Sequence, residues 1–295
     1  MEETQPQASV IVAVRNAEET LEACVRSLLD LDYPAQRELI CVDNGSADGS
    51  IGILESFAGS IRVLREQKPG AAAARNRGIR EARFSVIAFT DADCTVHPQW
   101  LRHLVEPLAD PSVGASGGPI LARQPCNAVE AFGELIHDNQ KAITHYQPPF
   151  VASGNWASRK SVLKQLDGFD ETFLRAQDVE LSCRMLQAGF KFEYASAAIV
   201  YHRNESTYGG LFHEGFTHGI HNVDLVERHR AFYERFGYRP RSLRPYRQLW
   251  GHLRNFMSAG NRGKDRSIAA CNLAFHAGKR IGRVAGSIRR GRLHL

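Results

Sequence analysis

Phe84-Ser85-Val86-Ile87-Ala88-Phe89-Thr90 is a largely apolar stretch that runs directly into Asp91-Ala92-Asp93. Its length and its branched side chains predict a strand buried on both faces, as in a parallel sheet. Ligands of such sheets bind where the strands end, so this strand is expected to deliver two carboxylates to a ligand-binding edge. Side chains two residues apart on an extended chain point the same way, which places Asp91 and Asp93 side by side.

Strand and helix signals alternate around this stretch. Further strands are expected at Ser9–Val14, Glu38–Val42 and Ile61–Leu64. A helix capped by Asn16 is expected after the first strand, and a second helix over Gly70–Ala82. This order predicts an α/β fold with an open, mostly parallel sheet flanked by helices.

The second half of the chain is less regular. Helices are expected at Cys126–Thr144, Ser158–Leu166 and Asp178–Ala188, and a last strand at Ala197–Tyr201. After Arg203 the composition shifts towards His, Arg and Gly. We therefore expect two domains, residues 1–203 and a helical, basic C-terminal region of residues 204–295.

Charge is distributed unevenly along the 295 residues, whose formal net charge is +5. Val226–Leu295 holds 17 Lys and Arg residues against three Asp and Glu residues, a charge of +14, whereas residues 1–225 carry −9. An acidic body with a basic tail indicates that the tail meets something anionic, such as a membrane surface, nucleic acid or an acidic acceptor.

The tail also shows a helical pattern. The apolar residues repeat at intervals of three and four, and they are Leu273, Ala277, Ile281, Val284 and Ile288. The basic residues on the other side are Lys279, Arg283 and Arg290. Such a helix either lies on an anionic membrane or packs on the rest of the protein with a solvated basic face. Three glycines, Gly278, Gly282 and Gly286, weaken a free-standing helix and favour one that forms when docked.

Cysteine usage and the N-terminus bear on location. The six cysteines are spread out without a Cys-X-X-Cys pair, which is typical of a reducing compartment. Met1–Gln7 lacks the basic start and apolar stretch of a signal peptide, and no stretch reaches the ~20 apolar residues of a spanning helix. The cytoplasm is the expected location, with the inner face of the membrane as a candidate site of peripheral attachment.

Asp91 and Asp93 are also the expected centre of the chemistry. Two neighbouring carboxylates repel each other unless a cation lies between them, and Mg²⁺ or Mn²⁺ with phosphate oxygens is the usual arrangement. The alternative is a solvated turn at the strand end, in which one aspartate caps the next helix.

Seven short motifs occur in a fixed order along the chain. They are Val12-Ala13-Val14-Arg15-Asn16, Val42-Asp43-Asn44-Gly45-Ser46 with Asp48-Gly49-Ser50, Lys68-Pro69-Gly70 through Ala74-Arg75-Asn76, Phe89-Thr90-Asp91-Ala92-Asp93, Ser153-Gly154-Asn155, Gly168-Phe169-Asp170-Glu171 and Gln177-Asp178-Val179-Glu180-Leu181. Together they resemble glycosyltransferase family 2, a large family of inverting enzymes with the Rossmann-like GT-A fold. The resemblance covers about two thirds of the chain, from Ser9 to His202.

The resemblance implies transfer of a sugar from a nucleotide diphosphate sugar, with uridine diphosphate (UDP) expected, to an acceptor hydroxyl. It implies a Mg²⁺ or Mn²⁺ cofactor, coordinated by Asp93 and His202. The donor-binding residues that it implies are Val14, Asn16, Asp43, Arg75, Asp91, Gly154 and Asn155. Among them, Asp43 is expected to accept the imide N–H of the base, Arg75 to hold the base or diphosphate, and Asp91 to approach the ribose.

Asp178 is the expected general base, which takes the proton of the acceptor hydroxyl. Its position before an apolar helical pattern is also typical of a helix N-cap. Here the chain departs from the family, because the usual Glu-Asp pair is Gln177-Asp178. The departure puts the class of acceptor in question more than the activity.

The expected partners are the donor and a glycan or lipid-linked acceptor of bacterial-type polysaccharide or glycolipid assembly. An anionic membrane surface is a further candidate partner, and nucleic acid is not expected. Two other functions remain open. A sugar-phosphate nucleotidyltransferase would carry a glycine-rich loop where this chain has Val14-Arg15-Asn16-Ala17-Glu18. A nucleotide-sugar-binding subunit without turnover is supported only by Gln177.

Overall fold

The computed structural model describes residues 5–239, 244–258 and 263–291. The start of the polar N-terminal segment and three arginines of the basic tail, Arg241, Arg262 and Arg292, lie outside the described residues. The chain divides into two compact units. The N-terminal unit comprises Met1–Arg123 and His137–His202, and the C-terminal unit comprises Gln124–Ile136 and Arg203–Leu295. The sequence predicted a single division at residue 203 and did not predict that residues 124–136 belong to the C-terminal unit.

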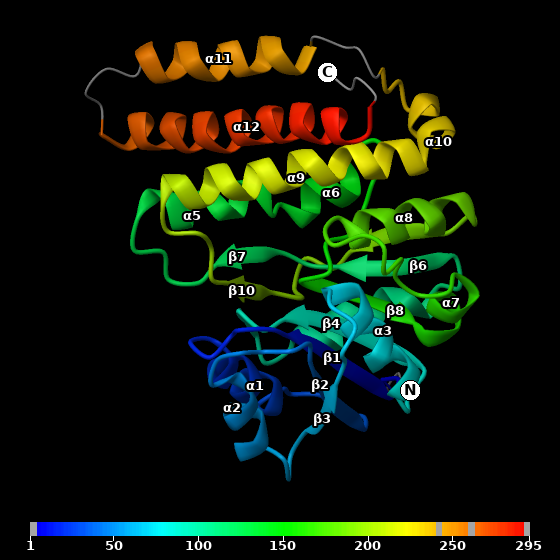
Figure 1. Ribbon diagram of the computed structural model, residues 1–295. Coiled ribbons are helices and arrows are strands. Elements are labelled where there is room, and N and C mark those ends of the chain that lie inside the picture. Colours follow the sequence, from blue (N-terminus) through cyan, green and yellow to red (C-terminus); the bar gives the residue numbers. More distant parts are fainter. Residues whose placement is uncertain (1–4, 240–243, 259–262, 292–295) are drawn as a thin grey trace. The chain divides into compact units, whose positions relative to one another are not determined.

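A seven-stranded sheet with the order β3-β2-β1-β4-β8-β6-β9 forms the centre of the N-terminal unit (Figure 1). Its strands are β1 (Ala8–Val14), β2 (Arg37–Asp43), β3 (Arg62–Arg65), β4 (Val86–Asp91), β6 (Val113–Gly117), β8 (Asn155–Arg159) and β9 (Lys191–Tyr194). The strands β3, β2, β1 and β4 run parallel, and β8 runs antiparallel to both of its neighbours. The sheet is therefore mostly parallel, as predicted.

A small second sheet joins three strands that are distant in sequence. It has the order β5-β10-β7, from Cys94–Val96, Val200–His202 and Ile120–Ala122. The helices of the N-terminal unit are α1 (Leu21–Leu29), α2 (Ser50–Ser56), α3 (Ala71–Glu81), α4 (Trp100–Val105), α6 (Asn139–Thr144), α7 (Lys160–Gln165) and α8 (Gln177–Gln187), with a 3-10 turn at Glu106–Ala109.

Two apolar clusters cover the two faces of the large sheet. Alternate residues of β1 divide between them, because successive side chains of a strand point to opposite faces. Val10 and Val12 pack with α1 and α4, whereas Ile11 packs with α3 and α8. This double burial explains why β1 and β4 appear in the sequence as continuous apolar stretches.

Several local expectations were wrong, and of the expected strand Ala197–Tyr201 only Val200 and Tyr201 belong to β10. The first helix begins at Leu21 after Thr20, and Asn16 instead adopts a positive φ of 50° in the loop after β1. The expected helix over Cys126–Thr144 is two helices, α5 (Ala128–Ile136) and α6, because the Asp138 side chain caps α6. The segment Ser158–Leu166 begins as strand β8, which pairs between β4 and β6, and only its second part is helical.

The C-terminal unit is helical. Its described residues form α5 and four further helices, α9 (Tyr208–Arg228), α10 (Arg230–Arg235), α11 (Arg244–Ser258) and α12 (Gly263–Arg289). Helix α12 packs along α9 and contacts α11 (Figure 1). A cluster of Val129, Phe132, Leu211, Cys271 and Phe275 joins α5, α9 and α12. No helix among the described residues is both long and apolar enough to cross a membrane.

Glycines determine how α9 and α12 meet. Gly215 and Gly219 of α9 face the backbone of α12, and Gly278 and Gly282 of α12 face the backbone of α9. A Cβ atom at any of these positions would lie well inside van der Waals contact with main-chain atoms of the other helix. Small residues spaced four apart thus allow the two helix backbones to approach closely.

This packing buries a different face of α12 from the apolar stripe predicted for it. Arg283, expected on the solvated side, is buried and contacts Tyr238. Ile281 and Ile288, expected on the apolar side, are 53% and 76% exposed. The tail helix is docked, but its glycine side rather than its isoleucine side lies against α9.

We predict that Gly282→Ala lowers the free energy of unfolding of the C-terminal unit by about 2 kcal/mol, because the new methyl group meets the backbone of α9. Urea unfolding followed by circular dichroism measures the change. Gly251→Ala in α11 is the matched control, because no atom of the residues that the structure describes lies within 4 Å of a Cβ there. The control should be neutral or stabilising by about 0.5–1 kcal/mol. Equal effects of the two substitutions would contradict close α9–α12 packing.

Candidate active site

Three parallel strands end at one edge of the large sheet and carry polar residues there. The register pairs Val14 of β1 with Asp43 of β2, and Ala13 of β1 with Asp91 of β4. Asp43 and Asp91 are therefore brought to the same edge, with β1 between them. The carboxyl edge of a parallel sheet is where ligands of this architecture bind.

The loops after β1 and β2 are tied to each other. The Asp43 carboxylate is buried and accepts the amide N–H groups of Gly45 (3.1 Å) and Ser46 (3.2 Å), which forms an Asx-turn. Asn16 accepts the amide of Ala47 (2.8 Å) with its side-chain oxygen. The Val14 side chain is fully buried in the core. Val14 and Asn16 thus shape these loops, and Asp43 retains one acceptor lone pair on each oxygen.

Arg75 is the most constrained charged group at this edge. Its guanidinium is buried, donates to Asp91 Oδ1 (2.6 Å) and lies 5.7 Å from the centre of the Phe169 ring. Arg75 Nε and Nη1 are also buried, and they find no hydrogen-bond partner among the described residues. Buried N–H groups that lack acceptors are costly, so they indicate a place for a ligand that supplies acceptor oxygens.

The ring beneath Arg75 is held by the next residue of α3. Asn76 donates to Phe169 O (2.8 Å) and accepts from Phe169 N (2.9 Å). Asn76 also donates to Glu171 Oε1 (2.8 Å), and Glu171 pairs with Lys68 (2.5 Å). These contacts join two of the sequence motifs, Lys68 through Asn76 and Gly168-Phe169-Asp170-Glu171, into one network behind the site.

The Ser153-Gly154-Asn155 loop lies against Asp91. Thr90 donates its hydroxyl to Gly154 O (3.0 Å), and a Cβ at Gly154 would lie 3.0 Å from Asp91 Oδ2. A side chain at position 154 would therefore crowd the carboxylate. The Asn155 side chain is fully buried, where it donates to Pro119 O and Ala198 O and accepts from the Trp100 indole. Asn155 supports the loop from behind.

The same loop also holds Asp178. Ser153 donates its backbone amide (3.1 Å) and its hydroxyl (3.4 Å) to Asp178 Oδ2. Adjacent residues of one loop thus contact Asp178 and Asp91. Asp178 is not the N-cap of α8, because the helix begins at Gln177 after Ala176, which has a left-handed φ of 58°. Gln177 is buried, and its Oε1 atom has no hydrogen-bond partner in the described part of the chain.

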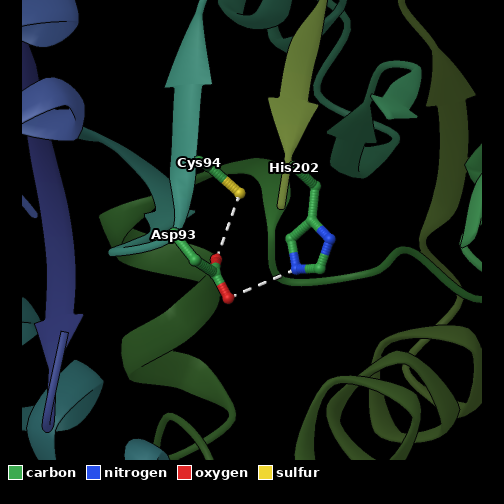
Figure 2. A group of neighbouring side chains, drawn as sticks. All are labelled: Asp93, Cys94 and His202. Atoms are coloured by element: carbon green, nitrogen blue, oxygen red, sulfur yellow. Dashed lines mark hydrogen bonds and ion pairs between the residues drawn. The ribbon is translucent and has the colours of Figure 1, made fainter. Parts of the chain in front are cut away.

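Asp93 does not share the Arg75 contact, because the chain turns after β4 and enters β5. Strand β10 pairs antiparallel with β5 and sets His202 opposite Cys94. Figure 2 shows Asp93 and His202 pointing towards each other, with 3.4 Å between Asp93 Oδ2 and His202 Nε2. The Cys94 thiol donates to Asp93 Oδ1 at 3.5 Å.

The titration properties of these groups differ. Removal of part of the Asp93 carboxylate from water alone raises its pKa, but the charge and hydrogen bond of His202 outweigh this effect and lower that pKa. Burial, followed by the charges of Asp93 and Asp91, raises the pKa of the Cys94 thiol well above its usual value. Asp93 is therefore a carboxylate at neutral pH, and Cys94 stays a thiol that orients it.

Two of the three residues, Asp93 and His202, fit a divalent metal site. Asp93, Cys94 and His202 are the one group of at least three His, Cys, Asp or Glu residues in the described segments whose ligand atoms lie within 4.8 Å of one another. The Asp93 side chain is 43% exposed and the His202 side chain 17%, so both are accessible. A carboxylate with an imidazole suits Mn²⁺ well, whereas Mg²⁺ favours all-oxygen sites.

Two features of this edge escaped the sequence interpretation. Ser153 was noted only within a motif, although it holds the expected base. His137, between α5 and α6, has its ring centre 5.0 Å from that of His202. Asp138, the residue that caps α6, is the local sequence signal for a helix boundary next to His137.

Comparison with known proteins agrees with this geometry. Residues 9–167 match the model of the family described as glycosyl transferase family 2. The glycosyltransferase AglE of Haloferax volcanii is 28% identical over 79% of this chain and 80% of its own length. The pre-mycofactocin glycosyltransferase of Mycobacterium tuberculosis is 31% identical over 66% of this chain, which spans 42% of that longer protein. The chain belongs to glycosyltransferase family 2 and is a transferase, which confirms the resemblance.

Solved structures confirm the GT-A fold. The mannosyltransferase PcManGT of Pyrobaculum calidifontis, in complex with GDP-Man and Mn²⁺, superposes with a TM-score of 0.67 at 20% identity, covering 96% of this chain and 87% of its own. Residues 1–349 of Staphylococcus aureus TarS, in complex with UDP, give a TM-score of 0.54 at 16% identity, covering 97% and 92%.

We predict that Asp93→Ala abolishes the metal dependence of nucleotide binding without unfolding the protein, because Asp93 would be the only carboxylate ligand in this group. The dissociation constant of a nucleoside diphosphate, measured by calorimetry with Mn²⁺, should rise about 100-fold towards its value with chelator. Asp32→Ala removes one exposed carboxylate elsewhere in the same unit and should leave binding unchanged. Tight donor binding by Asp93→Ala that is indifferent to chelator would show that the metal assignment is wrong.

Proposed function

We propose that this glycosyltransferase moves a sugar, with inversion, from a UDP-sugar to the hydroxyl of a glycan or lipid-linked acceptor. The main support for the proposal is the buried Arg75 guanidinium at the carboxyl edge of the sheet. Beside its contact with Asp91 it has two N–H donors that find no partner in the segments that the structure describes. A nucleotide diphosphate offers acceptor oxygens and negative charge to such a group.

The donor is proposed to lie along the edge from Asp43 to Asp93. Asp43 faces the base, Arg75 the base or diphosphate, and Asp91 the ribose, with the Gly154 loop near the sugar. A uracil-like base supplies an imide N–H for a remaining lone pair of Asp43. PcManGT is described with GDP-Man and TarS with UDP, which supports a nucleotide donor and leaves the base as part of the proposal.

Asp93 and His202 are proposed to hold Mg²⁺ or Mn²⁺. A bound divalent cation would neutralise negative charge on the departing diphosphate. The Mn²⁺ of the PcManGT complex and the fit of Asp93 with His202 support this cofactor.

Asp178 is proposed to remove the proton of the acceptor hydroxyl. The hydroxyl oxygen then forms a bond to the anomeric carbon, and the bond from that carbon to the diphosphate breaks on the opposite face. The electron pair leaves with the nucleoside diphosphate, so a single displacement inverts the configuration. The contacts from Ser153 fix the orientation of Asp178, because they occupy Oδ2 from one side.

Gln177 bears on the acceptor. A neutral amide in place of the family's glutamate removes a charge beside the base, while its Oε1 atom remains available to accept a hydrogen bond. An acceptor that donates a hydroxyl or amide proton satisfies this atom.

Location in the cytoplasm, at or near the inner face of a membrane, and a role in polysaccharide or glycolipid assembly are parts of the same proposal.

We predict that Asp178→Asn separates binding from chemistry. The substitution keeps the size of the side chain but removes the base, so turnover should fall by about 10² or more. Donor affinity should stay within a few-fold of wild type, because Asp178 is not among the groups proposed to bind the nucleotide. Single-turnover transfer from a radiolabelled donor, with calorimetry for affinity, measures the two effects.

Asp167→Asn is the matched control for this substitution. Asp167 is exposed and has a positive φ of 56°, which asparagine also tolerates. Its activity should equal that of wild type. Transfer by Asp178→Asn at the wild-type rate would assign the role of base to another group.

A further inference from the structure

Helix α11 exposes two of the largest apolar side chains in the C-terminal unit. Trp250 is 70% exposed and Met257 is 66% exposed. They are seven residues apart, which is two helical turns, so they lie on the same side of the helix. Single exposed apolar residues need no explanation, but a tryptophan and a methionine aligned on one helix indicate a contact surface.

Basic residues accompany this pair. Arg247 and Arg254 are exposed and lie three residues before and four residues after Trp250, on the adjoining part of the same face. The sequence of α11 contains no Asp or Glu. We call Arg247, Trp250, Arg254 and Met257 the outer face of α11.

The other side of α11 is already occupied. His252 stacks on His276 of α12 with 4.4 Å between ring centres, and Arg266 of α12 lies over the Phe256 ring. Leu249 and Leu253, on the same side as these residues, are partly buried. Helix α12 thus covers one side of α11. The outer face of α11, on the other side, carries a separate set of apolar and basic residues.

We propose that the outer face of α11 binds an anionic lipid surface. Tryptophan favours the boundary between lipid and water, methionine adds apolar area, and two arginines match anionic headgroups. An anionic lipid surface also complements the charge of the surrounding chain, because residues 226–295 carry a formal charge of +14. A second copy of this chain would bring two such basic surfaces together, which charge repulsion opposes.

This surface differs from the one that the sequence suggested. The tail helix α12 lies between α9 and α11, so removing it would disrupt the packing of the unit. Substitutions on the outer face of α11 leave that packing untouched. The proposal does not depend on the transfer reaction, because lipid binding is measured without donor or acceptor.

Sedimentation of the full chain with vesicles tests the proposal. Binding to phosphatidylcholine vesicles that contain phosphatidylglycerol is expected at low salt, with release at high salt and no binding to phosphatidylcholine alone. Trp250→Ser with Met257→Ser should weaken binding about tenfold or more. Arg247→Gln with Arg254→Gln should weaken it about 30-fold.

Two matched controls test whether vesicle binding depends on the outer face of α11 or on any exposed arginine or apolar residue. Arg65→Gln with Arg83→Gln removes two exposed arginines of the N-terminal unit, and Leu135→Ser removes an exposed apolar residue of α5. Both should bind vesicles within about twofold of wild type, and circular dichroism should show every variant folded.

Equal binding by the α11 variants and wild type, or no binding of wild type to anionic vesicles, would overturn the proposal. Sedimentation equilibrium that shows a dimer which Trp250→Ser with Met257→Ser dissociates would make a second copy the occupant. Binding to single-stranded DNA through the same four residues, without vesicle binding, would make nucleic acid the partner. Either result means that the lipid assignment is wrong.

Discussion

The arrangement of the site depends on one ion pair, between the buried Arg75 of α3 and the partly buried Asp91 at the end of β4. A guanidinium that is removed from water needs partners, and Asp91 and the face of Phe169 supply them. Because Asp91 is fixed in this way, the Gly154 loop can pack against it, and the neighbouring Ser153 can hold Asp178. The groups proposed for donor binding and for proton removal are thus positioned by one continuous set of contacts.

The ion pair also separates the two aspartates that follow β4. Asp91 is bound to a protein cation, whereas Asp93 turns towards His202 and remains partly exposed. Two like charges two residues apart therefore do not compete for the same neighbour. Arg75 has two further buried N–H groups without a partner in the described part of the chain, and the proposed donor would supply acceptors for them. This division explains how one short motif can serve both a nucleoside and a metal ion in the proposed function.

The strands that are buried on both faces of the large sheet could be predicted from the sequence, because such burial requires an apolar stretch within the strand itself. Strands β1, β2 and β4 appear as apolar stretches because both sheet faces are covered, and their polar ends mark the site. Strand β8 was missed because Asn155-Trp156-Ala157-Ser158-Arg159 becomes a strand through pairing with β4 and β6, which no local pattern records. The Asp93–His202 contact also arises from pairing of distant strands, and the family resemblance was needed to suggest it. On α12, apolar periodicity selected the isoleucine side, whereas backbone contact through Gly278 and Gly282 decided which side is buried.

The proposed function requires that this edge of the sheet bind a nucleotide diphosphate sugar together with a divalent cation. A thermal-shift screen of the purified chain against UDP- and GDP-sugars, each with Mn²⁺ and with chelator, tests it most directly, because a ligand that binds only the folded state raises the melting temperature. We expect a UDP-sugar and Mn²⁺ together to raise the melting temperature by more than the sum of the rises with each alone. An unchanged melting temperature with every nucleotide sugar in the presence of Mn²⁺ would contradict it.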